Sequence, residues 1–169
     1  EWSPGQNGPV EGGKPERESR VRQAQWLPAR NYMTGVQIPQ DPVKAMNWYK
    51  QAAELNLGPA RYVLARFNQT GYGGVKDIKE AQKLYTNAAE YGYAPAQLSL
   101  GDLYYYGTEV PQDFPRAFAW FQQAAKQKKP QAQYVLAMMY EQGQGITADP
   151  QKALAFYKDA AVAGHPDAQ

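Results

Sequence analysis

Few residues of this chain could carry out catalysis. The sequence has one histidine, His165, and no cysteine. A histidine-based catalytic triad and a usual zinc site both need more such side chains. The lack of cysteine also excludes a cysteine nucleophile, a thiolate metal site and a disulfide framework. His165 stands between Gly164 and Pro166 in a predicted loop, where a histidine is most often an ordinary surface residue.

Two further patterns superficially match functional motifs. The segment "GYGG" at 71–74 resembles a glycine-rich phosphate loop, but no predicted strand precedes it and its first glycine ends a predicted helix. Paired carboxylates could serve a glycosidase, but the regularly spaced aspartates are better explained as helix caps. The sequence therefore predicts a protein that is not an enzyme and uses no cofactor or metal.

Composition and charge narrow the class of protein further. The chain of 169 residues is 43% apolar and 20% charged, which is typical of a globular protein, and it holds thirteen tyrosines. Its formal charge of +2 is spread over mixed signs, so neither nucleic acid nor an anionic membrane is an expected partner. No apolar run reaches transmembrane length, so membrane insertion is not expected either.

The predicted structural elements of the chain repeat at a regular interval. Alanine, leucine, glycine and aspartate recur at a spacing of 36 residues, and paired alanines close each unit, with no insertion anywhere. The recurring residues are Ala24, Ala60, Ala96, Ala132 and Ala168; Leu64, Leu100 and Leu136; Gly35, Gly71, Gly107 and Gly143; and Asp41, Asp77, Asp113 and Asp149.

Each unit is predicted to form two helices. The first runs from about 96 to 106 in the clearest copy and ends at Gly107, since glycine readily adopts the left-handed conformation past a helix end. Asp113 then caps the second helix. Among the three tyrosines before Gly107, Tyr104 is expected to pack between the paired helices of its unit, whereas Tyr105 and Tyr106 are interpreted as side chains that the fold does not require.

The pattern of these units resembles the Sel-one-like repeat (SLR) family, whose members are related to tetratricopeptide repeats. It appears as "AQLSLGDLYYYGTEVPQDFPRAFAWFQQAA" at 96–125, as "AQYVLAMMYEQGQGITADPQKALAFYKDAA" at 132–161, and more loosely at 60–89. The resemblance implies an all-α fold, a right-handed superhelical solenoid of antiparallel helix pairs. The predicted repeats are 58–93, 94–129 and 130–165, preceded by a degenerate repeat at 24–57 that has Pro28 where leucine belongs.

Both ends depart from the pattern. Residues 1–23 are rich in glycine and proline, which predicts an extended arm, with Trp2 as a candidate anchor. Residues 166–169 match the start of a further repeat, so self-association through this unfinished unit is one expectation. Because the first residue is Glu1, an upstream secretion signal is also expected, and with it a periplasmic or envelope location; the cytoplasm is the alternative.

The family resemblance implies that the first helices line a concave face, and one stripe of that face carries unusual residues for a solvated helix. The stripe holds tyrosines, a leucine and a methionine, and aromatic residues and methionine are favoured where proteins bind proteins. The alternatives are that these side chains touch neighbouring repeats, or that the N-terminal arm occupies the groove. The predicted partner-binding residues are Tyr62, Arg66, Gln69, Leu98, Asp102, Tyr105, Tyr106, Tyr134, Met138 and Glu141.

The function expected from this stripe is binding of a protein or an extended peptide in the concave groove. By resemblance to the family, the protein would be a bacterial envelope adaptor, or an immunity protein that inhibits a secreted effector enzyme. The alternative is a module that binds envelope polysaccharide or peptidoglycan, because exposed tyrosines also suit sugars.

Overall fold

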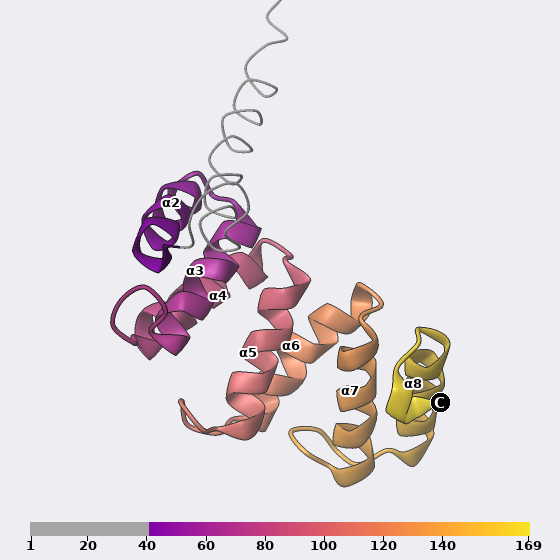
Figure 1. The fold of residues 1–169 in the computed structure, drawn as a ribbon. Coiled ribbons are helices and arrows are strands. Elements are labelled where there is room, and N and C mark those ends of the chain that lie inside the picture. The colour runs from indigo at the N-terminus through magenta and orange to yellow at the C-terminus, as the bar shows by residue number, and fades with distance from the viewer. Residues whose placement is uncertain (1–40) are drawn as a thin grey trace, which may run out of the picture.

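The computed structural model describes residues 41–169, which form helices and connecting turns and contain no strand in this range (Figure 1). The predicted arm at 1–23, its anchor Trp2 and the first part of the degenerate repeat, with Pro28, lie outside the described residues. The helices are α2 (Pro42–Glu54), α3 (Gly58–Thr70), α4 (Ile78–Glu90), α5 (Ala94–Tyr106), α6 (Phe114–Lys126), α7 (Pro130–Gln142), α8 (Pro150–Val162) and the 3-10 turn η1 (Pro166–Ala168).

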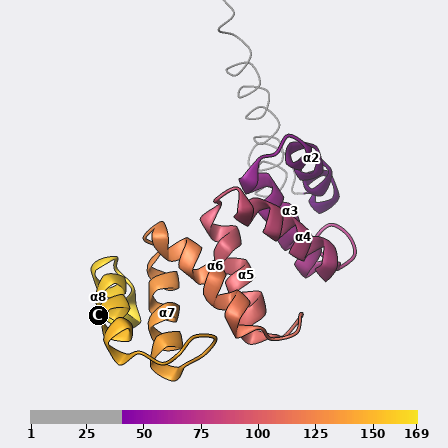
Figure 2. The ribbon, with the colours of Figure 1, turned by 180° about the vertical axis from the view of Figure 1, so that it is seen from behind.

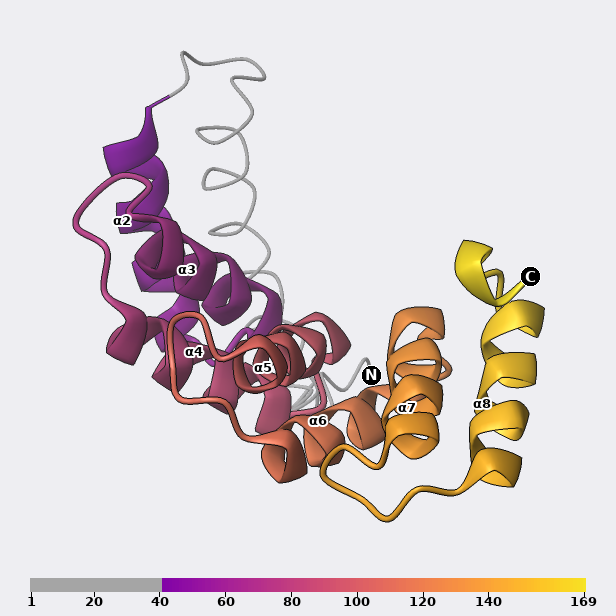
Figure 3. The ribbon, with the colours of Figure 1, turned by 90° about the horizontal axis from the view of Figure 1, so that it is seen from below.

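The helices follow one another in an arc of antiparallel pairs (Figures 1 and 2). α3 pairs with α4, α5 with α6 and α7 with α8, and the contacts within each pair are more extensive than those between pairs. In the view from below, α3, α5 and α7 lie toward the inside of the arc, and α4 and α6 toward the outside (Figure 3). The predicted all-α solenoid of 36-residue units is therefore confirmed.

Aspartate caps begin each second helix, as the sequence predicts. The side chain of Asp113 accepts a hydrogen bond from the backbone N–H of Arg116 at 3.0 Å, and that of Asp77 accepts one from Glu80 at 3.0 Å. Asp41 and Asp149 make the same kind of cap. Each cap satisfies a backbone donor that the helix itself leaves unpaired.

Glycine ends each first helix in the left-handed region. Gly71, Gly107 and Gly143 have φ angles of 78°, 63° and 69°. The loop that follows folds back, so that the backbone N–H of Asp113 donates to the carbonyl of Tyr104 at 2.8 Å. α5 begins at Ala94, two residues before the predicted start, because Pro95 suits the first turn of a helix.

Small side chains let the helices approach closely. Ala60, Ala96 and Ala132 on the first helices are fully buried, and so are Ala88, Ala124 and Ala160 on the second helices. Tyr104 and Tyr140 contact the second helix of their own unit, as predicted, through Arg116 and Phe156. Both also fill space against the preceding unit, which the sequence did not predict. The hydroxyl of Tyr104 accepts a hydrogen bond from Gln82 on α4 at 2.7 Å, and the ring of Tyr140 lies 5.4 Å from that of Phe118 on α6.

In the middle unit a glycine allows a close approach of this kind. Gly101 occupies the position of Ala65 and Ala137 in the other units, and a Cβ atom at Gly101 would lie 2.5 Å from Cε1 of Phe121. The Phe121 ring is fully buried. The absence of a side chain at Gly101 therefore makes room for this ring.

We expect Gly101→Ala to destabilise the fold. Alanine gains about 1 kcal/mol over glycine inside a helix, but overpacking a filled core costs about 1–3 kcal/mol. The free energy of unfolding, measured by chemical denaturation, should fall by about 1–2 kcal/mol. In a Phe121→Leu background the same change should be neutral or stabilising, and an equal loss in both backgrounds would show that the ring is not the cause.

Candidate functional site

Each first helix contributes several residues to the predicted stripe. In the first and last units described below, the earliest of these residues packs against the second helix of its own unit. The Tyr62 ring lies 5.7 Å from Tyr85 on α4 and 5.5 Å from Tyr93 in the turn that follows. In the last unit, the Tyr134 ring lies 5.6 Å from Tyr157 and stacks on His165 at 4.2 Å. His165 is thus part of an aromatic cluster, and the prediction that it is an ordinary surface residue is wrong.

The middle unit lacks this cluster. Its equivalent first-helix residue is Leu98, which is half-buried and packs on the apolar core. The position equivalent to Tyr93 and His165 is occupied by Lys129 instead of an aromatic residue. The row of rings along the predicted stripe is therefore interrupted between Tyr62 and Tyr134.

The last predicted position of the stripe links the two helices of a unit. The Tyr85 hydroxyl donates to Gln69 at 2.7 Å, and the Tyr157 hydroxyl donates to Glu141 at 2.8 Å. Burial, reinforced by the bond to Glu141, raises the pKa of Tyr157 to about 12, so its hydroxyl stays a donor at neutral pH. Gln69 and Glu141 therefore hold their units together.

Tyr105 occupies the same position in the middle unit and connects two units. Its ring makes edge contacts with Phe114 at 5.4 Å and Phe121 at 6.3 Å, and its hydroxyl donates to Gln144 of the next unit at 3.0 Å. The interpretation that the fold does not require Tyr105 is wrong. The alternative that stripe residues touch neighbouring repeats is correct for this side chain.

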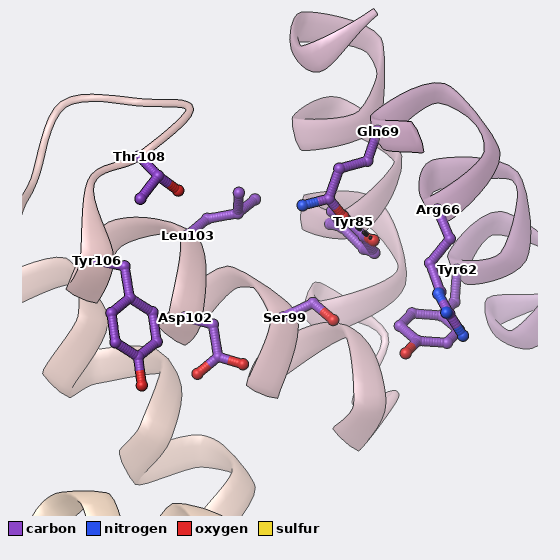
Figure 4. A pocket seen from close by; sticks show the side chains of 9 residues that line it. All are labelled: Tyr62, Arg66, Gln69, Tyr85, Ser99, Asp102, Leu103, Tyr106 and Thr108. Carbon is purple, nitrogen blue, oxygen red and sulfur yellow. Dashed lines mark hydrogen bonds between the residues drawn. The ribbon is translucent and has the colours of Figure 1, made fainter. Parts of the chain in front are cut away.

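A pocket of about 530 Å³ opens between α3 and α5 (Figure 4). Five of the ten predicted residues line it: Tyr62, Arg66, Gln69, Asp102 and Tyr106. The residues that sequence reasoning missed are Tyr85, Ser99, Leu103 and Thr108. Of these, Tyr85 could have been predicted by comparing the repeats. Tyr85 lies sixteen residues after the stripe residue Gln69, and Tyr157 lies sixteen residues after the stripe residue Glu141.

The other five predicted residues do not line this pocket. Leu98, Tyr105, Tyr134 and Glu141 make the contacts described above, and Met138 is a half-buried residue of α7. At the junction of α5 with α7, Val135 and Met138 occupy the positions that Ser99 and Asp102 hold at the junction of α3 with α5. The pocket therefore lies where small and polar side chains replace bulky apolar ones.

Asp102 is a half-buried carboxylate for which, among the described residues, the structure gives no hydrogen bond or ion pair. Figure 4 shows its side chain projecting from α5 into the pocket, next to Tyr106 one helical turn later. Burial raises the pKa of Asp102 to about 6, because the ionised form loses solvation that nothing replaces. The carboxylate is thus charged at neutral pH and uncompensated.

Arg66 and Tyr106 also line this pocket, and both side chains are exposed. Tyr106 is 63% exposed, and its one ring contact in the described part of the chain is an edge contact with Tyr105 at 5.1 Å. Arg66 has no ion pair within residues 41–169. These side chains contribute little to the packing of the solenoid.

An ion pair bridges the two loops next to the pocket. Glu109 lies 2.9 Å from Nζ of Lys76, and its other carboxylate oxygen accepts a hydrogen bond from Gln69 at 2.8 Å. Burial opposes ionisation of Glu109, but the bonds from Lys76 and Gln69 outweigh it, so the pKa of Glu109 is lowered. The charge of Glu109 is therefore satisfied within the protein, in contrast to that of Asp102.

The described residues show neither a metal-binding cluster nor a membrane-spanning helix. Within residues 41–169, no group of three or more histidine, cysteine, aspartate or glutamate side chains could hold a metal ion. None of the helices described is both long and apolar enough to cross a membrane.

The fold and the pocket define a class of protein, the helical repeat solenoid with a polar cavity between adjacent units. The model of the Sel1 repeat matches residues 23–57, 58–93, 94–129 and 130–165, so the chain belongs to the Sel1 repeat family. Sel1 repeat proteins are protein-interaction scaffolds and are generally non-catalytic.

Solved structures agree with this assignment. A Sel1 repeat protein from Oxalobacter formigenes is 34% identical, with a TM-score of 0.82 over 91% of this chain and 45% of the other. A protective antigen of uropathogenic Escherichia coli with an SLR fold is 31% identical, with a TM-score of 0.83 over 92% of this chain and 34% of the other. This chain thus spans less than half the length of either relative.

More distant similarity extends only to the fold. Cysteine-rich protein B of Helicobacter pylori is 22% identical, with a TM-score of 0.59 over 76% of this chain and 92% of the other. No curated protein matches this sequence.

Two neighbouring tyrosines provide a matched test of which stripe residues the fold uses. Truncating a large, well-packed ring costs about 3–5 kcal/mol, and Tyr105 is half-buried, so Tyr105→Ala should lower the free energy of unfolding by about 2–3 kcal/mol. Tyr106→Ala should change it by less than about 0.5 kcal/mol, because exposed positions tolerate substitution. Urea denaturation measures both, and equal losses would contradict the different packing of the two rings.

The raised pKa of Asp102 predicts a dependence of stability on pH. The carboxyl titrates near 3.8 when unperturbed and about 6 in the fold, so the folded state binds the proton more tightly. The stabilisation that proton binding to Asp102 provides is fully present below pH 3.8, and it is lost as the pH rises through about 6.

Asp102→Asn removes this titration. It should raise the midpoint of thermal unfolding by about 2–4 °C at pH 7.5 and change it little at pH 4. Asp159→Asn, at an exposed position of α8, is the control and should have no such pH-dependent effect. A similar effect of Asp102→Asn at both pH values would contradict the raised pKa.

Proposed function

We propose that this chain is a non-catalytic scaffold that binds a protein or an extended peptide along its first-helix face, with the pocket between α3 and α5 as the central contact. The observation that carries the proposal is the set of pocket residues that the fold leaves unused. Tyr106 is mostly exposed, Arg66 has no ion pair in the described chain and Asp102 has no partner there. An aromatic ring beside unpaired polar groups is typical of a binding site.

The position of the pocket at the junction of two units also supports a polymeric ligand. The pocket is lined from two consecutive units, by residues of α3 and α4 on one side and by α5 and the loop after it on the other. A segment that crosses this junction would contact both units, and its side chains would alternate between pocket and solvent. Family membership supports a protein as the ligand.

A more specific role extends this proposal. The relatives that are 34% and 31% identical come from bacteria, which supports a bacterial source. A role as an adaptor at the cell envelope is part of the same proposal. Tight inhibition of a secreted effector enzyme, as an immunity protein, is a specialised form of the same activity. A periplasmic or envelope location and self-association through residues 166–169 remain proposals of the same kind, and the cytoplasm is the alternative location.

A second candidate is binding of envelope polysaccharide or peptidoglycan. The pocket combines the exposed ring of Tyr106 with the hydroxyl groups of Ser99 and Thr108 and the amide of Gln69. Such a mixture of a ring face and hydrogen-bonding groups suits a sugar.

A comparison of peptide and glycan ligands distinguishes the two candidates. The full chain is used to select binders from a displayed library of random linear peptides and is also applied to an array of peptidoglycan and polysaccharide fragments. Selected peptides should bind Tyr106→Ala about 5- to 30-fold more weakly, because a central tyrosine is commonly worth about 1–2 kcal/mol. Glycan binding that Tyr106→Ala weakens, with no peptide selected, would favour the second candidate.

A further inference from the structure

The pocket between α3 and α5 contains a half-buried negative charge that the described chain does not neutralise. Asp102 lies half-buried on α5, and no lysine or arginine of residues 41–169 lies within ion-pair distance of it. The aspartates at the helix caps, in contrast, bond to backbone N–H groups, and Glu109 pairs with Lys76. A buried carboxylate without a partner is costly to the fold, and a ligand that neutralises it would recover that cost.

The groups around Asp102 favour a cation as that ligand. Tyr106 projects next to Asp102, and Tyr62 lies across the pocket (Figure 4). A carboxylate beside tyrosine rings can bind an ammonium or guanidinium group by an ion pair and by cation–π contact together. A neutral sugar would hydrogen-bond to the same residues but would leave the negative charge uncompensated.

We infer that this pocket binds a lysine or arginine side chain of a polypeptide partner, with Asp102 as its counter-charge and Tyr106 as one wall. The inference rests on the proposed scaffold function and specifies the chemistry of its partner. Arg66, at the α3 side of the pocket, supplies donors for a backbone carbonyl of the same partner segment. The polypeptide is thus oriented with its basic side chain toward α5.

Binding of such a side chain should depend on pH. Besides Asp102, the charged and titratable groups that line the pocket are Arg66 and Tyr62 on α3, Tyr85 on α4 and Tyr106 on α5. The Glu109–Lys76 pair lies in the adjoining loops. Burial raises the pKa of Tyr85, and the pKa of Glu109 is lowered, so neither changes charge between pH 5 and 7. Asp102, with a pKa of about 6, does.

The experiment uses ¹⁵N-labelled full-length chain and two probes, Nα-acetyl-lysine N-methylamide and its norleucine analogue, which has the same number of side-chain carbons and no charge. The lysine probe should shift the backbone amide signals of residues 99–108 and 66–69, and the norleucine probe should not. The affinity of the lysine probe should be about tenfold higher at pH 7 than at pH 5, in proportion to the ionised fraction of Asp102.

Substitutions test whether Asp102 is the residue that binds the lysine probe. Asp102→Asn should abolish binding of the lysine probe, and Asp159→Asn, an exposed carboxylate on α8, should retain it. Thermal unfolding of Asp102→Asn checks that the loss is not one of folding. Equal binding of the two probes, no binding of the lysine probe, or unchanged binding by Asp102→Asn would each overturn the inference.

Two further probes identify the kind of occupant. Binding of n-butylamine as tight as that of the lysine probe would mean that a small amine, and not a polypeptide, is bound, and would overturn the inference; so would preferential binding of a chitin disaccharide. Library peptides that bind through Tyr106 without a basic residue would also overturn it while leaving the scaffold function intact. The scaffold function itself fails if the selection yields no peptide.

Discussion

The structure depends on close contact between helices that carry alanine at fixed positions. Alanine presents a single methyl group, so two helices can pack with their backbones close and their remaining side chains interleaved. The alanines of the first and second helices are fully buried in successive units, for example Ala96 and Ala124. Because the same contact recurs every 36 residues, each unit is placed on the next in nearly the same way, and the arc of Figure 3 results.

Close packing at the alanines leaves larger gaps beside them, and aromatic side chains fill these gaps. Tyr104 and Tyr140 do so between units, and Phe121 does so within a unit where Gly101 makes space. Tyr105 adds a hydrogen bond to Gln144 in the next unit. Most of the tyrosines on the inner helices are therefore structural, and a site must be built from the few side chains that this packing does not use.

The pocket between α3 and α5 arises from differences between units that are otherwise alike. Ser99 and Asp102 stand where the next unit has Val135 and Met138, so the first junction keeps a polar cavity. Comparison of the repeats could have identified these substitutions in advance. The contacts of Tyr105 could not have been found in this way, because its partner Gln144 lies 39 residues further along the chain and is brought near only by the stacking of two units.

The sequence by itself determined the helices, their ends and their repetition. Helix caps such as Asp113 and helix ends such as Gly107 act through backbone groups a few residues away, and local chemistry of this kind can be predicted from residue type and spacing. Only the tertiary structure decided which exposed-looking tyrosines are packed, why His165 is stacked on Tyr134, and that Asp102 has no partner among the described residues. These properties depend on distances between units, which follow from how side chains of different size pack across each junction.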